Sequence, residues 1–196
     1  MEKSNEDKSN TDHRLFLIID FEATCCDRGS IPREETEVIE IGAVMVDAET
    51  LTGVDEFSTF VRPVRHSRLT AFCTELTSIT QDQVDAAPGF ADVVNQIRQW
   101  AEQYPGYLFC SWGDYDRNQL TRECRIHGVS FPFGTDHLNL KKRFSERQGL
   151  RKKLGMAGAL RRAGIPLDGT HHRGIDDARN IAKLLPFIVG DARLPK

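Results

Sequence analysis

Two carboxylates, Asp20 and Glu22, stand at the end of the apolar run Leu15–Ile19. A run this apolar predicts a strand buried on both faces, and side chains two apart on a strand point the same way. Both acids are therefore expected to face one site. Because two unpaired carboxylates repel each other and lose solvation there, a divalent cation is the natural partner, and oxygen ligands favour Mg²⁺ or Mn²⁺ over zinc. The alternative is a strand that ends in solvated acids.

Three more residues have matching chemistry. Asp116 lies where a strand is expected to pass into a helix, and Asp177 opens the last predicted helix. His172 precedes Asp177 by five residues, and an imidazole titrates near neutral pH. Taken singly, each acid could serve as a helix cap or face a helix dipole, and the histidine could be an ordinary loop residue.

Taken jointly, the order and spacing of these residues resemble the DEDDh branch of the DEDD-type 3′–5′ exonucleases, in which the histidine stands five residues before the final aspartate. The resemblance implies catalytic roles for Asp20, Glu22, Asp116, His172 and Asp177. Two shifts of register stay open. His171 with Asp176 has the same spacing as His172 with Asp177, and Asp114 competes with Asp116.

The chain is more closely similar to the Eri-like exoribonucleases, a group that includes the histone mRNA 3′ exonuclease and bacterial relatives of the KapD type. The stretches that carry this similarity are residues 20–25, 72–73, 76–84 and 112–116, and the similarity extends from about Leu15 to Leu185. It implies a ribonuclease H-like fold, that is, a mixed five-stranded sheet flanked by helices in a single α/β domain.

The resemblance also implies a mechanism. Four carboxylates (Asp20, Glu22, Asp116 and Asp177) would hold two divalent ions, Mg²⁺ or Mn²⁺, and His172 would act as general base. The product would be a nucleoside 5′-monophosphate released from a single-stranded RNA 3′ end, with single-stranded DNA as a second candidate substrate. Stacking on Phe72 and Trp112, with Ala23 and Thr24 near the terminal ribose, would hold that end, although both aromatic residues could instead belong to the core.

Two other functions compete with this interpretation. A DNA exonuclease of repair or proofreading type would use the same five residues, and preference for the ribose 2′-hydroxyl would distinguish it. A non-catalytic RNA-binding scaffold could keep the fold without the activity. The sequence argues against the scaffold because all five motif positions are filled.

Apolar patterning predicts the elements that position these residues. Strands are expected at residues 15–19, 38–46, 54–61 and 107–110. A capping box at Thr80–Gln83 predicts a short helix, and apolar residues at helical spacing predict a longer one from Phe90 to Trp100. Further helices are expected at residues 114–127, 138–148, 156–163 and 175–185.

Length and composition indicate the domain organisation and the location of the protein. The 196 residues, 39% of them hydrophobic, suffice for one well-filled domain at 13–190, with a disordered tail at 1–12 and a C-terminal tail at 191–196. No stretch suits a signal peptide or a membrane span, and the five cysteines form no C-x-x-C pair, so a soluble cytoplasmic protein is expected. The resemblance to the Eri-like exoribonucleases implies that no obligatory protein partner is needed. Residues 101–196 carry 17 basic and 10 acidic side chains, and their densest basic cluster, Lys141 to Lys153, could follow a phosphate backbone or form a solvated helix face.

Overall fold

The computed structural model describes residues 13–195, so the tail predicted for residues 1–12 lies outside the described part of the chain. A five-stranded sheet in the order β3-β2-β1-β4-β5 forms the centre. The first three strands in the chain pair antiparallel, whereas β4 and β5 run parallel to β1. This arrangement confirms the predicted mixed sheet. The strands are β1 (Leu15–Ala23), β2 (Val38–Asp47), β3 (Gly53–Phe60), β4 (Tyr107–Ser111) and β5 (His137–Asn139).

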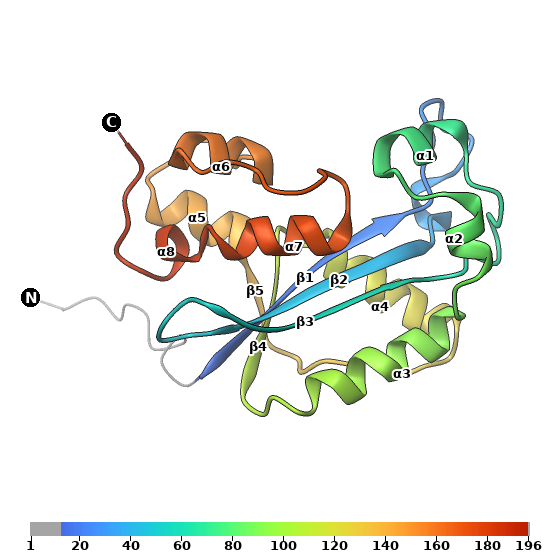
Figure 1. Ribbon diagram of the computed structural model, residues 1–196, viewed down its shortest axis with the longest axis horizontal. Helices are drawn as coiled ribbons and strands as arrows, with labels where there is room; N and C mark the ends of the chain where they lie inside the picture. Colours follow the sequence, from blue (N-terminus) through green and yellow to red (C-terminus); the bar gives the residue numbers. More distant parts are fainter. Residues whose placement is uncertain (1–12, 196) are drawn as a thin grey trace, which may run out of the picture.

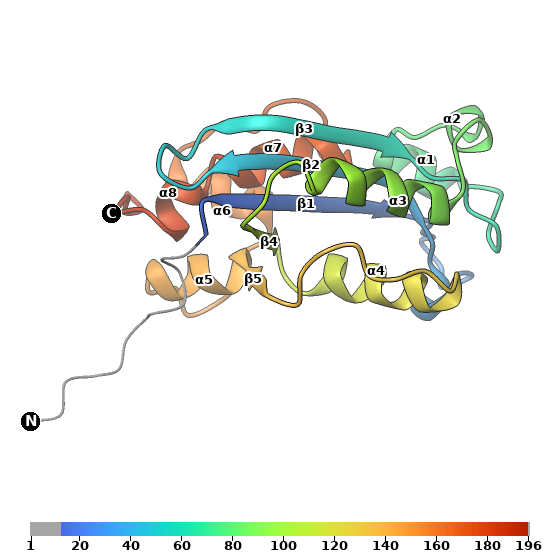
Figure 2. The ribbon, with the colours of Figure 1, turned by 90° about the horizontal axis from the view of Figure 1, so that it is seen from below.

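Helices cover both faces of this sheet. Figures 1 and 2 show α5 to α8 along one side and α3 and α4 along the other, while α1 and α2 lie near the end of β1. A 3₁₀ turn, η1 (Arg33–Glu35), precedes β2. The helices are α1 (Ala71–Thr77), α2 (Gln81–Asp85), α3 (Phe90–Ala101), α4 (Tyr115–Ile126), α5 (Leu140–Arg147), α6 (Met156–Ala163), α7 (Gly174–Ala182) and α8 (Leu185–Ile188).

Alternation along β1 divides the core into two layers. Leu17 and Ile19 pack with the residues of α3, whereas Phe16 and Ile18 pack with those of α5 to α8. Side chains two apart share a face of a strand, so Asp20 continues the series that begins at Phe16 and Ile18. The acidic pair therefore belongs to the face of the sheet that α7 covers.

Several predicted boundaries differ from the observed ones. β1 continues through the acids to Ala23, because its pairing with β2 extends that far. The helix predicted at 138–148 is α5 preceded by the short strand β5, and the helix predicted at 175–185 is α7 followed by α8. Helix α1 was not predicted. The capping box at the start of α2 is confirmed: the Thr80 amide donates to Gln83 Oε1 at 2.8 Å.

Close backbone packing fixes the start of α7 on the sheet. A Cβ atom added to Gly42 in β2 would lie 2.0 Å from the carbonyl carbon of Gly174, the first residue of α7. A Cβ on Gly174 would in turn lie 3.0 Å from the Asp20 carbonyl oxygen. Only glycine allows this approach, which brings the first turn of α7 directly over the end of β1.

The end of the described chain lies against α5. Gln148, the residue after this helix, donates to the Ala192 carbonyl oxygen at 3.0 Å and accepts from the Leu194 amide at 3.0 Å. Leu194 also packs on the core beneath α5 to α8. Within residues 13–195, no helix combines the length and the apolar character needed to cross a membrane.

Candidate active site

The four acids of the predicted motif meet in one cavity of about 360 Å³. Asp20 and Glu22 come from the end of β1, Asp116 from the first turn of α4, and Asp177 from the first turn of α7. The parallel pairing of β1 with β4 explains this convergence, because the carboxyl ends of both strands reach the same edge of the sheet. Helix α4 begins just beyond β4, so Asp116 lies beside Asp20.

Burial makes this cluster electrostatically unfavourable without a cation. Glu22, Asp116 and Asp177 are 8%, 4% and 5% exposed. Loss of solvation, followed by repulsion from neighbouring acids, raises the pKa of Glu22 to about 8. Burial likewise raises the pKa of Asp116 to about 7, even though the Phe21 amide donates to its Oδ1 at 3.2 Å.

The remaining two acids show the same trend. Burial and the charges of Asp116 and Glu22 raise the pKa of Asp20 well above its ordinary value, and burial raises that of Asp177. Oxygen atoms of Asp20, Glu22 and Asp177 lie within 4.8 Å of one another. Since a divalent ion would relieve the repulsion that raises these pKa values, the donor set fits a hard metal with oxygen ligands.

The structure separates the acids that the sequence left ambiguous. Asp116 lines the cavity, whereas the Asp114 side chain is 51% exposed and accepts from Asn139 Nδ2 at 2.9 Å. Asp177 lines the cavity too. Asp176 instead turns to the other side of α7, where its Oδ2 accepts from the Thr170 amide at 2.9 Å.

Both candidate histidines line the cavity, and their rings stack with centroids 3.9 Å apart. His171 Nδ1 lies 3.0 Å from Asp177 Oδ2, and the His172 amide donates to the same oxygen at 3.1 Å. Burial, followed by the charge of His171, lowers the pKa of His172. The geometry therefore places both rings at the acids without selecting one. His171, His172 and Asp177 also form a group that could hold a metal ion.

Of the residues predicted to hold the substrate, Ala23, Thr24 and Trp112 line the cavity. Trp112 packs on Phe144 with ring centroids 5.8 Å apart and donates from Nε1 to the Leu154 carbonyl oxygen, so its ring is held in place. Phe72 lies on α1, 37% exposed and outside the cavity wall.

Sequence reasoning missed other residues of the wall. Leu76, Tyr115 and Met156 belong to it, and the first two are more than a third exposed. Leu76 lies one helical turn beyond Phe72 on α1, and of these two residues Leu76 is the one that lines the cavity. Large exposed apolar side chains at the rim of an acidic cavity suit the flat faces of nucleobases.

A fifth acid, Glu40, was also missed. It stands on β2 directly opposite Glu22 and is 1% exposed. A charged residue inside the apolar run 38–46 was the available signal, because a charge seldom enters a core strand without a partner. That partner is Arg173, the residue after His172.

A larger cavity of about 800 Å³ lies at the opposite end of β1, around His13, Phe16 and Leu51. Its acids are Asp47, the last residue of β2, and Glu49 in the turn that follows, and the Asp47 carboxylate accepts from the amides of that turn. Chemistry therefore favours the smaller cavity as the functional site.

Comparison with known proteins agrees with this geometry. The sequence matches the RNase_T family, described as exonuclease, over residues 17–185. The chain belongs to the exonuclease family. This membership confirms the resemblance to DEDDh exonucleases that the motif spacing indicated. The matched range includes every acid and histidine in the cavity.

Curated members of the exonuclease family are similar along most of the chain. Mouse 3′-5′ exoribonuclease 1 is 34% identical over 184 residues, covering 90% of this chain and 53% of the relative. Human ERI1 exoribonuclease 3 is 33% identical over 182 residues, covering 88% of this chain and 53% of the relative. The chain thus spans about half the length of these relatives.

Solved structures extend the agreement to the fold. The nuclease domain of 3′hExo, a DEDDh family member bound to rAMP, has a TM-score of 0.81 at 30% identity and covers 95% of this chain and 98% of that one. The 3′-exonuclease that recognises the histone mRNA stem-loop has a TM-score of 0.84 at 30% identity, with coverage of 92% and 65%. These structures confirm the predicted sheet flanked by helices.

Proposed function

We propose that this protein is a metal-dependent 3′–5′ exoribonuclease that removes nucleoside 5′-monophosphates from single-stranded RNA 3′ ends. The observation that carries the proposal is the convergence of four carboxylates, three of them buried, together with two histidines, on one open cavity. Buried carboxylates that repel one another destabilise the folded protein, and bound cations remove that repulsion. Similarity to proteins named 3′-5′ exoribonucleases supports the same reaction.

Asp20, Glu22, Asp116 and Asp177 would hold two divalent ions, Mg²⁺ or Mn²⁺. When bound, the ions would supply charge neutralisation at the scissile phosphate for in-line attack by water. His172 would accept the proton of the attacking water. Its lowered pKa keeps the imidazole neutral near pH 7, which a general base requires.

The cavity wall offers places for the terminal nucleotide. Ala23 and Thr24 lie next to Glu22 on the same chain segment and would face the terminal ribose. Trp112, Leu76 and Tyr115 present large apolar faces to a base. These contacts would favour an unpaired end, because only an unstacked base can lie flat on a side chain.

Basic residues lie beside the same wall. A Cβ on Gly113 would lie 3.9 Å from Lys141 Cδ, so the start of α5 adjoins the residue after Trp112. The exposed side chains of Arg151, Lys152 and Lys153 precede Leu154, whose carbonyl accepts from Trp112. We propose that this basic cluster holds phosphates upstream of the 3′ end.

The test is digestion of 5′-labelled single-stranded RNA and DNA of the same sequence, with Mg²⁺ or Mn²⁺. Stepwise shortening of RNA from its 3′ end is expected, abolished by EDTA and by Asp20→Ala. Equal cutting of DNA would favour the repair or proofreading function. Binding of RNA without shortening, under either metal, would favour the non-catalytic scaffold.

A further inference from the structure

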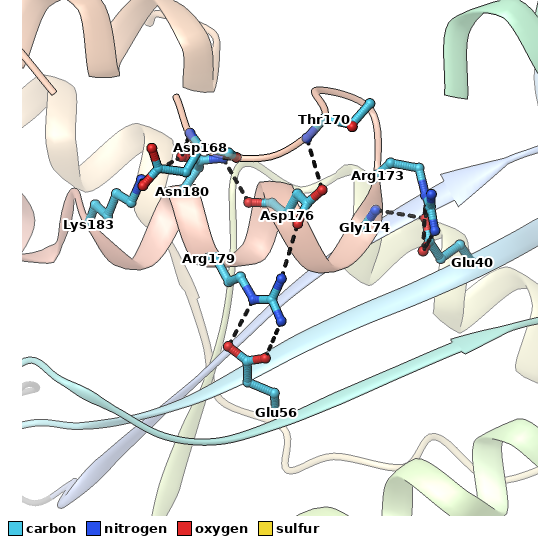
Figure 3. Close-up of polar contacts among 10 residues, drawn as sticks. All are labelled: Glu40, Glu56, Asp168, Thr170, Arg173, Gly174, Asp176, Arg179, Asn180 and Lys183. Carbon is cyan, nitrogen blue, oxygen red and sulfur yellow. Dashed lines mark hydrogen bonds and ion pairs between the residues drawn. The ribbon is translucent and has the colours of Figure 1, made fainter. Parts of the chain in front are cut away.

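The loop that carries the two histidines, residues 168–173, is tied down at both ends. At its start, the Asp168 amide donates to Asn180 Oδ1 at 3.0 Å. The Thr170 amide donates to Asp176, and a Cβ on Gly169 would lie 2.4 Å from the Asp176 carboxyl carbon. Figure 3 shows these contacts running along one side of α7.

At the other end of the loop, the partly buried Arg173 forms an ion pair with the fully buried Glu40. Arg173 Nη2 donates to Glu40 Oε1 at 2.9 Å, and Nε donates to Oε2 at 3.1 Å. The Gly174 amide donates to the same Oε2 at 2.9 Å. The guanidinium also lies 5.4 Å from the ring centroid of Phe60. Two-point contact of a planar guanidinium with a carboxylate fixes orientation as well as distance (Figure 3).

His172, immediately before this pair, has a left-handed backbone with φ 65°. A residue with a Cβ adopts this conformation only where its surroundings impose it. Arg173 and Gly174 are held on Glu40, and the His172 amide is held on Asp177. The strained residue is thus fixed between β2 and the acidic site.

We propose that Glu40 and Arg173 are positioning residues, which hold the histidine loop over the four acids so that the general base meets the attacking water. The inference rests on the proposed exonuclease function. Both carboxylate oxygens of Glu40 accept from Arg173 and Gly174, and among the described residues Glu40 belongs to neither group of side chains that could hold a metal ion. Its charge, which faces Glu22 across the two strands, is balanced by Arg173.

The molecule offers a matched control. Arg179 and Glu56 form a second two-point ion pair between α7 and the sheet, but their side chains are 47% and 43% exposed. Figure 3 shows Arg179 between Glu56 and Asp176, with Asp176 in turn bonded to Thr170 of the loop. Glu56→Gln removes this pair, while the bond of Arg179 to Asp176 and that of Asp176 to Thr170 of the loop can stay in place.

The first experiment compares Glu40→Gln, Arg173→Gln and Glu56→Gln in RNA digestion. We expect kcat to fall about 10- to 100-fold for the Glu40 and Arg173 variants, as for other residues that orient a catalytic group, while KM changes by less than about 3-fold. The control variant should stay within about 2-fold of the unaltered protein. Arg173→Lys keeps the positive charge but lacks the two-point geometry of the guanidinium, so its kcat should lie between those of Arg173→Gln and the unaltered protein.

A second experiment separates positioning from a merely structural role. In a variant with both His171 and His172 replaced by Ala, Glu40→Gln should cause no further loss of kcat, because the group it positions is gone. The same fold-loss in both backgrounds would overturn the proposal. Mn²⁺ affinity, measured by calorimetry, should not weaken in Glu40→Gln, and a large loss would reassign Glu40 to the metal site.

Amide hydrogen exchange tests, independently of activity, whether the Glu40–Arg173 ion pair clamps the histidine loop. Exchange at residues 170–174 should accelerate in Glu40→Gln and Arg173→Gln but not in Glu56→Gln. Unchanged protection would refute the clamp even in an active enzyme. Conversely, if the unaltered protein cuts neither RNA nor DNA, faster exchange would uphold the clamp while the proposed function fails.

Discussion

At the residue scale, Asp177 couples the histidine loop to the acids. One of its oxygens accepts from the His172 amide and lies 3.0 Å from His171 Nδ1, while the carboxylate also belongs to the cluster with Asp20 and Glu22. Any movement of the loop therefore alters the acid cluster. The two histidines differ in their relation to Asp177: only the His171 ring contacts its carboxylate.

Replacement of each histidine tests which ring is the base. We expect His172→Ala to lower kcat by about 10² to 10⁴-fold, the usual contribution of a general base. His171→Ala should cost about 10-fold, as the loss of a residue that orients a ligand does. The pH profile of kcat provides a second readout, since only replacement of the general base should remove the fall of kcat at acidic pH. A larger loss with His171→Ala would show that the other register is the right one.

The two acids at the start of α4 provide a second residue-scale prediction. Asp116→Asn should abolish Mg²⁺-dependent digestion and weaken Mn²⁺ binding, because it removes a buried carboxylate of the proposed metal site. Asp114→Asn should keep kcat within about 3-fold, since the Asp114 side chain is 51% exposed and its ion pair with Arg117 lies at the surface, where such pairs contribute little. Calorimetric titration of Mn²⁺ and RNA digestion measure both effects. Equal metal affinity in the two variants would contradict the assignment of Asp116.

At the element scale, the start of α7 decides whether the third block of the motif reaches the first. Gly42 and Gly174 bring the helix and the sheet into backbone contact. The helix dipole further favours a negative charge in the first turn, where Asp177 lies. Two glycines outside the motif thus bring the acids of the motif together.

Gly42→Ala should separate these elements. Its Cβ would lie 2.0 Å from backbone atoms of α7, so the helix must shift, and overpacking of this kind costs about 1 to 3 kcal/mol. We expect lower thermal stability and weaker Mn²⁺ affinity together. Gly53→Ala is the control, because its Cβ would meet only Val44 at an ordinary 3.6 Å. Unchanged metal affinity in Gly42→Ala would show that the contact does not position Asp177.

The elements also show what the sequence could predict. The acids were predictable because each follows a strongly patterned strand or opens a helix, and their spacing is local. Strand β5 has three residues, too few for a pattern. Helix α1 carries only two buried residues, Cys73 and Thr77, so periodicity could not reveal it. Glu40 and Arg173 are 133 positions apart, and their pairing exists only in the folded chain.

At the scale of the whole molecule, the acid cluster links pH, metal binding and stability. A carboxyl whose pKa is higher in the folded than in the unfolded chain stabilises the fold below its unfolded pKa, and that stability is lost as pH rises through the folded pKa. Glu22, with an ordinary pKa of 4.5 raised to about 8, is such a group. The metal-free protein should therefore lose stability as pH rises toward 8.

Thermal unfolding in EDTA between pH 7.0 and 8.5 tests this link, in a range above the ordinary histidine pKa. We expect Tm to fall with pH by several degrees, since about 1 kcal/mol corresponds to about 2 to 4 °C in a chain of this size. Mn²⁺ should raise Tm most at the high end of the range, because the ion binds the ionised carboxylates and must displace fewer protons there. Glu22→Gln removes the titrating group, so Tm in EDTA should fall less steeply as pH rises. A fall of the same slope in Glu22→Gln would place the titrating group elsewhere, and a Tm that rises with pH in EDTA would contradict the raised pKa of the cluster itself.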